Sequence, residues 1–155
     1  MRLLSTPSRL YRLLALGEVI TWTLLLAGMF LKYVVDATDV LVRIGGGLHG
    51  FTFLAYVVVT VLVAVDQRWK LTDLLLGLGS AIIPYLTVPF ERSARRRGLL
   101  GDTWQLRERQ GRTAPERLVS WALRHPLPAV LITVVGVAVV FSVLLSLGPP
   151  TEWFG

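Results

Sequence analysis

The stretch GGGLHGFTFLAY, residues 45–56, places three consecutive glycines and a histidine at the head of a run that stays apolar as far as Val65. A run of this length and character predicts a helix that crosses a membrane. An ionisable group at membrane depth faces a protein interior or a water-filled cavity, because lipid offers it no partner. His49 is therefore the strongest indication of a site in this chain.

The composition of the whole chain agrees with a membrane location. Of its 155 residues, 54% are apolar and 17% are charged, whereas a soluble domain carries about 25% charged residues. The apolar residues form blocks of about 20, the length that a helix needs to cross a bilayer and twice that of a transmembrane strand. The sequence therefore predicts an all-α integral membrane helical bundle. The absence of cysteine excludes disulfides, thiolate metal sites and cysteine nucleophiles.

Two antiparallel spans, residues 13–35 and 40–65, are predicted on either side of a short link. The first span carries one acid, Glu18, and the second carries polar residues at helical spacing on one face. Counting the rise along both helices places Tyr56 at the depth of Glu18 and His49 near the middle of the bilayer. We therefore expect an intramembrane polar site made of Glu18, His49, Thr52 and Tyr56.

A third apolar segment, residues 71–90, also has polar and small residues on one face. It contains Pro84, which removes a helical hydrogen bond and should kink the helix. Small residues let neighbouring helices approach closely in a membrane. We therefore predict a three-helix core whose packing and kink positions are Gly46, Gly50, Gly77, Ser80 and Pro84.

The remainder of the chain divides into a basic loop and a last span. Residues 113–116, TAPE, match a capping box and predict a short helix to about His125. Its apolar side and flanking arginines are typical of a helix that rests in the head-group layer. Residues 127–147 are apolar and uncharged, which predicts a further transmembrane helix. The predicted domains are a membrane domain over 1–92, a basic loop over 93–126 and an anchor with its tail over 127–155.

The net charge of +6 is concentrated beside the predicted spans. Basic residues in such positions set topology and contact anionic lipid head groups, so we expect lipid and not nucleic acid as a partner. The residues expected at the membrane interface or in contact with head groups are Lys32, Arg43, Trp69, Arg95, Arg96, Arg97 and Trp121.

The positions of the charges conflict over topology. Four full spans would put the N-terminal arginines and the nine arginines between residues 91 and 126 on opposite sides of the membrane. The positive-inside rule then favours a cytoplasmic loop. If the segment 71–90 were re-entrant at Pro84, both basic regions could be cytoplasmic. We expect four spans in the cell inner (plasma) membrane, with the loop 91–126 in the cytoplasm.

A set of residues recurs in order and spacing along the first three apolar segments, namely Gly17, Glu18, Met29, Lys32, Tyr33, Gly46, His49, Gly50, Phe53, Tyr56, Trp69 and Pro84. In this pattern the chain resembles, from about Leu10 to Arg92, an uncharacterised bacterial membrane family, domain of unknown function 3817. The resemblance implies the three-helix membrane fold and no assigned activity. The basic loop and the last span lie outside it.

Three kinds of function remain open at this stage. The first is a non-enzymatic accessory or scaffolding subunit of a larger membrane complex, associated with other membrane subunits or with itself. The second is a small transporter or proton-coupled channel that uses Glu18 and His49, and the third is an enzyme acting on lipid or quinone. Glu18 and His49 could equally be satisfied by local hydrogen bonds. We expect no catalytic residues, metal or cofactor, because no nucleophile or metal-ligand set accompanies these two residues.

Overall fold

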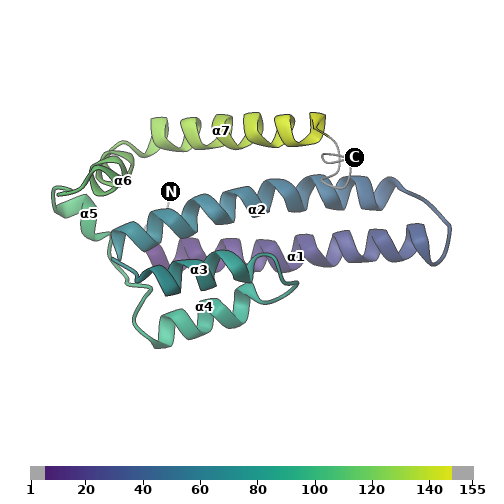
Figure 1. Cartoon of the computed structure of the whole chain (residues 1–155), viewed down its shortest axis with the longest axis horizontal. Helices are drawn as coiled ribbons and strands as arrows, with labels where there is room; N and C mark the ends of the chain where they lie inside the picture. The colour runs from purple at the N-terminus through teal and green to yellow at the C-terminus, as the bar shows by residue number, and fades with distance from the viewer. Residues whose placement is uncertain (1–5, 148–155) are drawn as a thin grey trace.

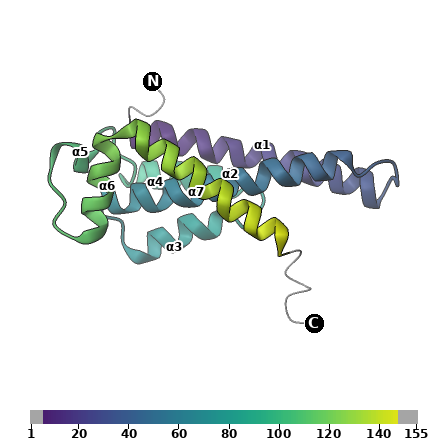
Figure 2. The ribbon, with the colours of Figure 1, turned by 90° about the horizontal axis from the view of Figure 1, so that it is seen from above.

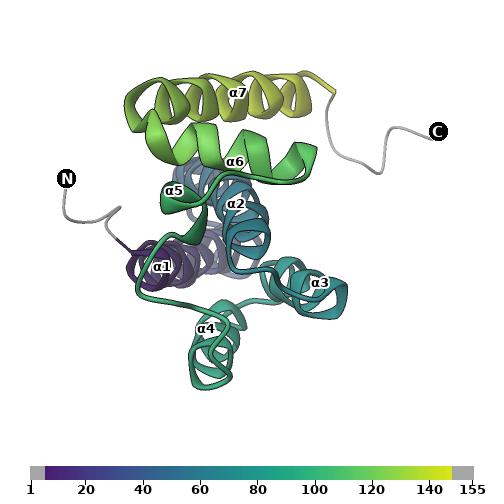
Figure 3. The ribbon, with the colours of Figure 1, turned by 90° about the vertical axis from the view of Figure 1, so that its left-hand side faces the viewer.

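A computed structural model describes residues 6–147, and the secondary structure in this range is helical throughout, which confirms the all-α prediction. Two long antiparallel helices form the axis of the molecule (Figure 1). A short helical pair lies along one side of them and the C-terminal helices lie along the other (Figure 3). The predicted tail after residue 147 lies outside the described residues. In order, the helices are α1 Pro7–Tyr33, α2 Val40–Asp66, α3 Leu71–Ser80, α4 Thr87–Arg96, α5 Gln105–Glu108, α6 Ala114–Arg124 and α7 Pro126–Ser146.

The central pair, α1 and α2, is long enough to cross a membrane. Each helix has 27 residues, a length of about 40 Å. α1 begins earlier than predicted because the Thr6 side chain accepts a hydrogen bond from the Arg9 N–H and Pro7 starts the first turn. The two helices approach most closely at glycines. A Cβ on Gly28 would lie 2.5 Å from the Val42 nitrogen, so this contact excludes any side chain.

The third predicted span is not one helix but a hairpin of two. α3 and α4 have 10 residues each, or about 15 Å, half the thickness of the hydrocarbon core. The chain reverses over residues 81–86, where Pro84 breaks the helix and Tyr85 adopts a φ of +67°. Three described helices, α1, α2 and α7, are long and apolar enough to cross a membrane, so four full spans are not confirmed, and the segment that falls short is 71–90.

Hydrogen bonds to main-chain oxygens hold the hairpin against α1. The Trp22 indole N–H donates to the Ala81 oxygen at 3.3 Å, and the Thr87 hydroxyl donates to the Ala15 oxygen at 3.0 Å. The tip of the hairpin therefore contacts α1 near its middle. The main apolar core extends from Ala81, at this tip, toward the end where α1 begins and α2 ends, and comprises Tyr11, Ala15, Tyr56, Val63, Ala81, Ala94, Leu100 and Trp104.

The basic segment after α4 folds onto the end of α2. Asp66, the last residue of α2, is fully buried and accepts hydrogen bonds from the main-chain N–H groups of Gln105 and Leu106. The capping box predicted at 113–116 is present, because the Thr113 hydroxyl accepts from the Glu116 N–H at 3.4 Å. The Arg112 main-chain N–H and the Arg68 guanidinium hold the pKa of Glu116 below its usual value.

The last helix, α7, crosses α2 diagonally (Figure 2). Phe141 of α7 packs against Gly50 of α2, where an added Cβ would lie 2.7 Å from the Phe141 ring. Val137 is buried, but most of the described side chains of α7 are exposed. In a bilayer these apolar side chains face lipid or another membrane protein.

Candidate functional site

Glu18 is the most unusual buried group in the molecule. Its exposed fraction is 0%, and neither carboxyl oxygen has a hydrogen-bond partner among residues 6–147. α1 turns this side chain toward α2 because Tyr11, Ala15 and Glu18 follow one another at helical spacing on the buried face. A buried carboxyl group without a donor is costly, so it calls for a proton, a cation or water as its partner.

The nearest cationic candidate is His49 of α2. Its Nδ1 atom lies 3.8 Å from Glu18 Oε2, which is beyond hydrogen-bond length but close enough for a strong electrostatic interaction. The same nitrogen lies 3.2 Å from the Thr21 hydroxyl, and the Trp22 ring packs against the imidazole at a tilt of 48°, with the ring centroids 4.3 Å apart. The structure therefore brings together two of the four predicted site residues, Glu18 and His49.

The single hydroxyl proton of Thr21 can satisfy one of two acceptors. These are the Glu18 main-chain oxygen, at 3.2 Å, and His49 Nδ1. When the Thr21 hydroxyl donates to the Glu18 main-chain oxygen, it can only accept from His49, so Nδ1 must carry a proton. That proton then lies on the side of the imidazole that faces the Glu18 carboxyl group. The arrangement couples the tautomer of His49 to the electrostatic environment of Glu18.

Tyr56 belongs to a separate chain of hydroxyl groups. The Ser80 hydroxyl donates to the Gly77 oxygen at 2.7 Å, so Tyr56 must donate to Ser80, at 3.0 Å. By the same logic Tyr11 donates to Tyr56, at 2.6 Å, and Thr60 donates to Tyr11, at 3.4 Å. This chain joins α1, α2 and α3 and leaves its members satisfied, in contrast to Glu18.

Of the other polar and packing positions, Gly77 packs as expected, whereas Thr52, Gly46 and Pro84 have different surroundings. The Thr52 hydroxyl donates to the Leu48 oxygen of its own helix and takes no part in the Glu18 cluster. A Cβ on Gly46 would lie 3.8 Å from Leu25, an ordinary contact, whereas the close approach falls on the neighbouring Gly45. Gly77 packs against Thr60 and Phe90. Pro84 lies in the hairpin turn and not inside a kinked helix.

The predicted interface residues fall at both ends of the molecule. At the turn between α1 and α2, Lys32 lies over the Tyr33 ring and Arg43 pairs with Asp39 at 3.8 Å. At the opposite end, Arg95 pairs with Glu91, Arg97 pairs with Asp73, and Trp121 stacks on His125. Arg96 lines a groove beside α1.

Trp69, which was expected at the interface, is partly buried and packs against the apolar core. Its indole donates to the Leu99 oxygen at 2.7 Å and packs edge-on against Tyr11.

Three important residues were not among those predicted for the site. Tyr11 lies before the predicted start of the first span, although its spacing of seven residues from Glu18 would have placed it on the same helical face. Thr21 and Trp22 follow Glu18 directly on that face and provide the contacts to His49. Among the described residues, no group of three His, Asp or Glu side chains gathers as metal ligands.

Comparison with known proteins identifies the unit that carries this site. Residues 8–96, the segment from α1 to the end of α4, match the family described as domain of unknown function (DUF3817), and the chain belongs to this family. A Streptomyces coelicolor protein named "Putative membrane protein SCO5905" is 45% identical over 93 residues. The match covers 59% of this chain but 11% of that relative. No solved structure matches the chain. The protein is thus a membrane protein whose family has no assigned activity.

Proposed function

We propose that the protein is a non-enzymatic accessory or scaffolding subunit of a larger assembly in the inner membrane. The observation that carries the proposal is the size of the relative, since the shared segment makes up 11% of that protein. In the relative, the matched 93-residue segment is thus joined covalently to a much longer polypeptide. A unit that is fused to other segments in one protein can pack against separate subunits in another protein.

The packing of the chain supports the same role. Side chains of 0% exposure, among them Tyr11, Glu18 and Tyr56, fill the space between α1, α2 and the hairpin. α7, by contrast, presents a long apolar surface and leaves a cleft of ≈ 210 Å³ against α2, lined by residues that include Thr133, Gly136 and Val137. Small residues at such a cleft favour close helix contacts within a membrane. We assign α7 as the side that a partner subunit contacts.

Photocrosslinking in native membranes tests the accessory role. A photoreactive residue at Val135 of α7 should give one discrete crosslinked product, whereas the same residue at Ile20, on the exposed side of α1, should give much less. Mass spectrometry of the product identifies the partner. Extraction of the wild-type chain as a solitary 17.2 kDa species, with no crosslinked product from either position, would contradict the proposal.

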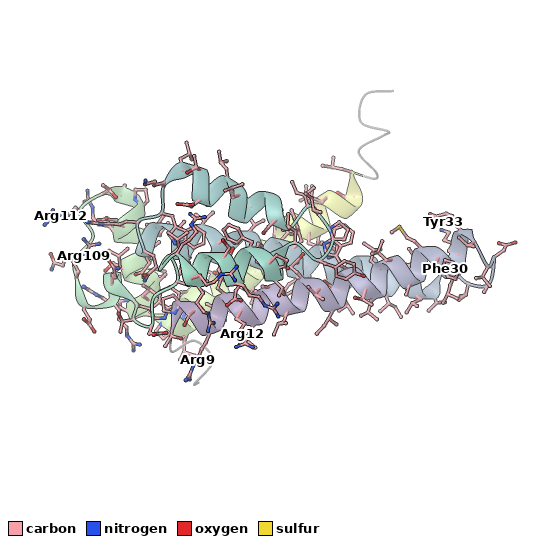
Figure 4. All side chains as sticks on the ribbon, turned by 90° about the horizontal axis from the view of Figure 1, so that it is seen from below. Arg9, Arg12, Phe30, Tyr33, Arg109 and Arg112 are labelled. Atoms are coloured by element: carbon pink, nitrogen blue, oxygen red, sulfur yellow. The ribbon has the colours of Figure 1, made fainter. Side chains whose placement is uncertain are left out.

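We also propose that the end carrying the N-terminus of α1 faces the cytoplasm. The re-entrant hairpin supports this orientation, because it returns the chain to the end from which α3 started (Figure 1). Arg9, Arg12, Arg109 and Arg112 then lie toward the same end, opposite Phe30 and Tyr33 (Figure 4). The positive-inside rule places such an end in the cytoplasm, and the conflict that arises with four spans disappears.

Cysteine labelling in intact cells distinguishes the two topologies, and the chain has no cysteine of its own. We expect Thr38→Cys, in the turn between α1 and α2, to react with an impermeant maleimide from outside. Arg112→Cys should react only after the membrane is opened. Four full spans would put both positions on the same side, so equal labelling of the two variants would exclude the hairpin topology.

The isolation of Glu18 supports a second candidate, a proton-coupled channel or transporter. A buried carboxyl group that has no donor among residues 6–147 and lies 3.8 Å from an imidazole is a suitable place to hold a transported proton. In liposomes with a trapped pH dye, Glu18→Gln and His49→Ala should each abolish proton flux. Thr52→Val is the matched control on the same helix as His49, because Thr52 bonds only within that helix. Equal flux in the wild type and in both site variants would remove this candidate.

A further inference from the structure

We propose that the groove between α1 and α4 binds the head group of an anionic phospholipid. The groove has a volume of ≈ 350 Å³ and lies at the basic end of the molecule. It is lined by four arginines, one acid and three apolar residues, namely Arg12, Ala15, Leu16, Val88, Glu91, Arg92, Arg95 and Arg96.

The charge of the groove is not neutralised from within the protein. Glu91 is its single acid, and its carboxylate accepts a hydrogen bond from Arg95 Nε at 3.1 Å and forms an ion pair with Arg95 Nη2 at 2.9 Å. Arg12, Arg92 and Arg96 make no ion pair with any of residues 6–147. Three unpaired guanidinium groups from two helices therefore border one cavity. Guanidinium groups bind phosphate oxygens through paired, charge-assisted hydrogen bonds.

The apolar part of the lining favours a lipid over a soluble anion. Ala15 and Leu16 come from the first turns of a transmembrane helix, and Leu16 is 41% exposed. Val88 lies opposite them on α4. A phosphate bound to the arginines at the membrane surface would thus have hydrocarbon beside it, where the glycerol and upper acyl chains of a phospholipid lie. Basic pockets on the cytoplasmic side of transmembrane helices bind anionic head groups in this way.

The number of free cations predicts an order of preference. One phosphodiester carries one negative charge and leaves two of the three arginines without a partner. We therefore expect diphosphatidylglycerol, which has two phosphates, to bind more tightly than phosphatidylglycerol, and phosphatidylcholine to bind least.

Native mass spectrometry of the purified full chain, titrated with each of these three lipids, tests the assignment. Replacing Arg12, Arg92 and Arg96 together by glutamine should weaken diphosphatidylglycerol binding by about fivefold per charge, or about a hundredfold in total. The control variant replaces Arg107, Arg112 and Arg117 by glutamine, which removes the same charge outside the groove. It should bind the lipid like the wild type.

Three results would overturn the proposal. The first is equal lipid binding by the wild type and the groove variant. The second is an equal loss in the control variant, which would mean attraction to the whole basic surface and not to the groove. The third is displacement of the lipid by millimolar inorganic pyrophosphate, which would mean a site for soluble phosphates. Single variants Arg92→Gln and Arg96→Gln, both at exposed positions, provide a second measurement and should each weaken binding by about fivefold.

Discussion

Gly28→Ala is expected to lower the free energy of unfolding by about 2 kcal/mol. The new Cβ would lie 2.5 Å from the Val42 nitrogen and 2.7 Å from the Leu41 carbonyl carbon. These are main-chain atoms of α2, so relief requires the two helices to move apart. Overpacking of this kind costs about 3 kcal/mol, and the better helix propensity of alanine returns about 1 kcal/mol.

Gly47→Ala is the matched control, because no atom lies within 4 Å of its Cβ position. There alanine should stabilise α2 by up to about 1 kcal/mol through propensity alone. Unfolding in mixed detergent micelles, followed by circular dichroism, measures both variants. If Gly28→Ala were as stable as Gly47→Ala, α1 and α2 would not be in main-chain contact at this point.

The contact at Gly28 also explains why the sequence predicted the two antiparallel helices correctly but not which of their residues lie opposite one another. Two antiparallel helices joined by a short link were predictable from the apolar blocks and their lengths. Counting the same rise per residue along both helices from the link places Tyr56 opposite Glu18, but the structure pairs Tyr56 with Tyr11 and Glu18 with His49. The count assumed that both helices reach the link at the same depth. The register is instead set by the interlocking of Gly28 and Gly45 with the facing backbone.

The hairpin could not be predicted from hydropathy alone. Residues 71–90 are apolar enough for one span, and Pro84 by itself is compatible with a kinked helix. The fold instead turns back, and its tip and returning helix are held by hydrogen bonds from Trp22 to Ala81 and from Thr87 to Ala15. Each of these bonds joins residues about 60 or more positions apart in the chain. No local pattern indicates such a bond.

The candidate site was predictable in its charged members and not in their surroundings. A histidine and a glutamate within apolar blocks stand out in the sequence, and the structure brings them together. Which hydroxyl groups join them depends on the register of α1 and α2, and Thr21 takes the place that was expected for Thr52. The absence of a donor at Glu18 is a property of packing that only coordinates reveal.

Asp66→Ala is expected to release the basic segment 97–125 from the end of α2. The carboxylate of Asp66 accepts the main-chain N–H groups of Leu106, at 2.8 Å, and of Gln105, at 3.2 Å. Alanine would leave both donors without a partner, beside a fully buried Leu106 side chain. Unmade buried hydrogen bonds to a charged acceptor cost about 3 kcal/mol together. Local opening should thus increase about a hundredfold, measured as faster tryptic cleavage after Arg107 and Arg109.

Two further variants separate the hydrogen bonds of Asp66 from its charge. Asp66→Asn retains one acceptor oxygen, so it should keep part of the protection against trypsin. If the negative charge were what holds the segment, Asp66→Asn would instead be cleaved as fast as Asp66→Ala. Asp39→Ala removes a half-exposed carboxylate at the opposite end of α2 and should leave cleavage unchanged. Cleavage of Asp66→Ala at the wild-type rate would show that α5 is held by its apolar contacts alone. The next residue to replace would then be Leu106, which is fully buried and is the apolar side chain that α5 buries.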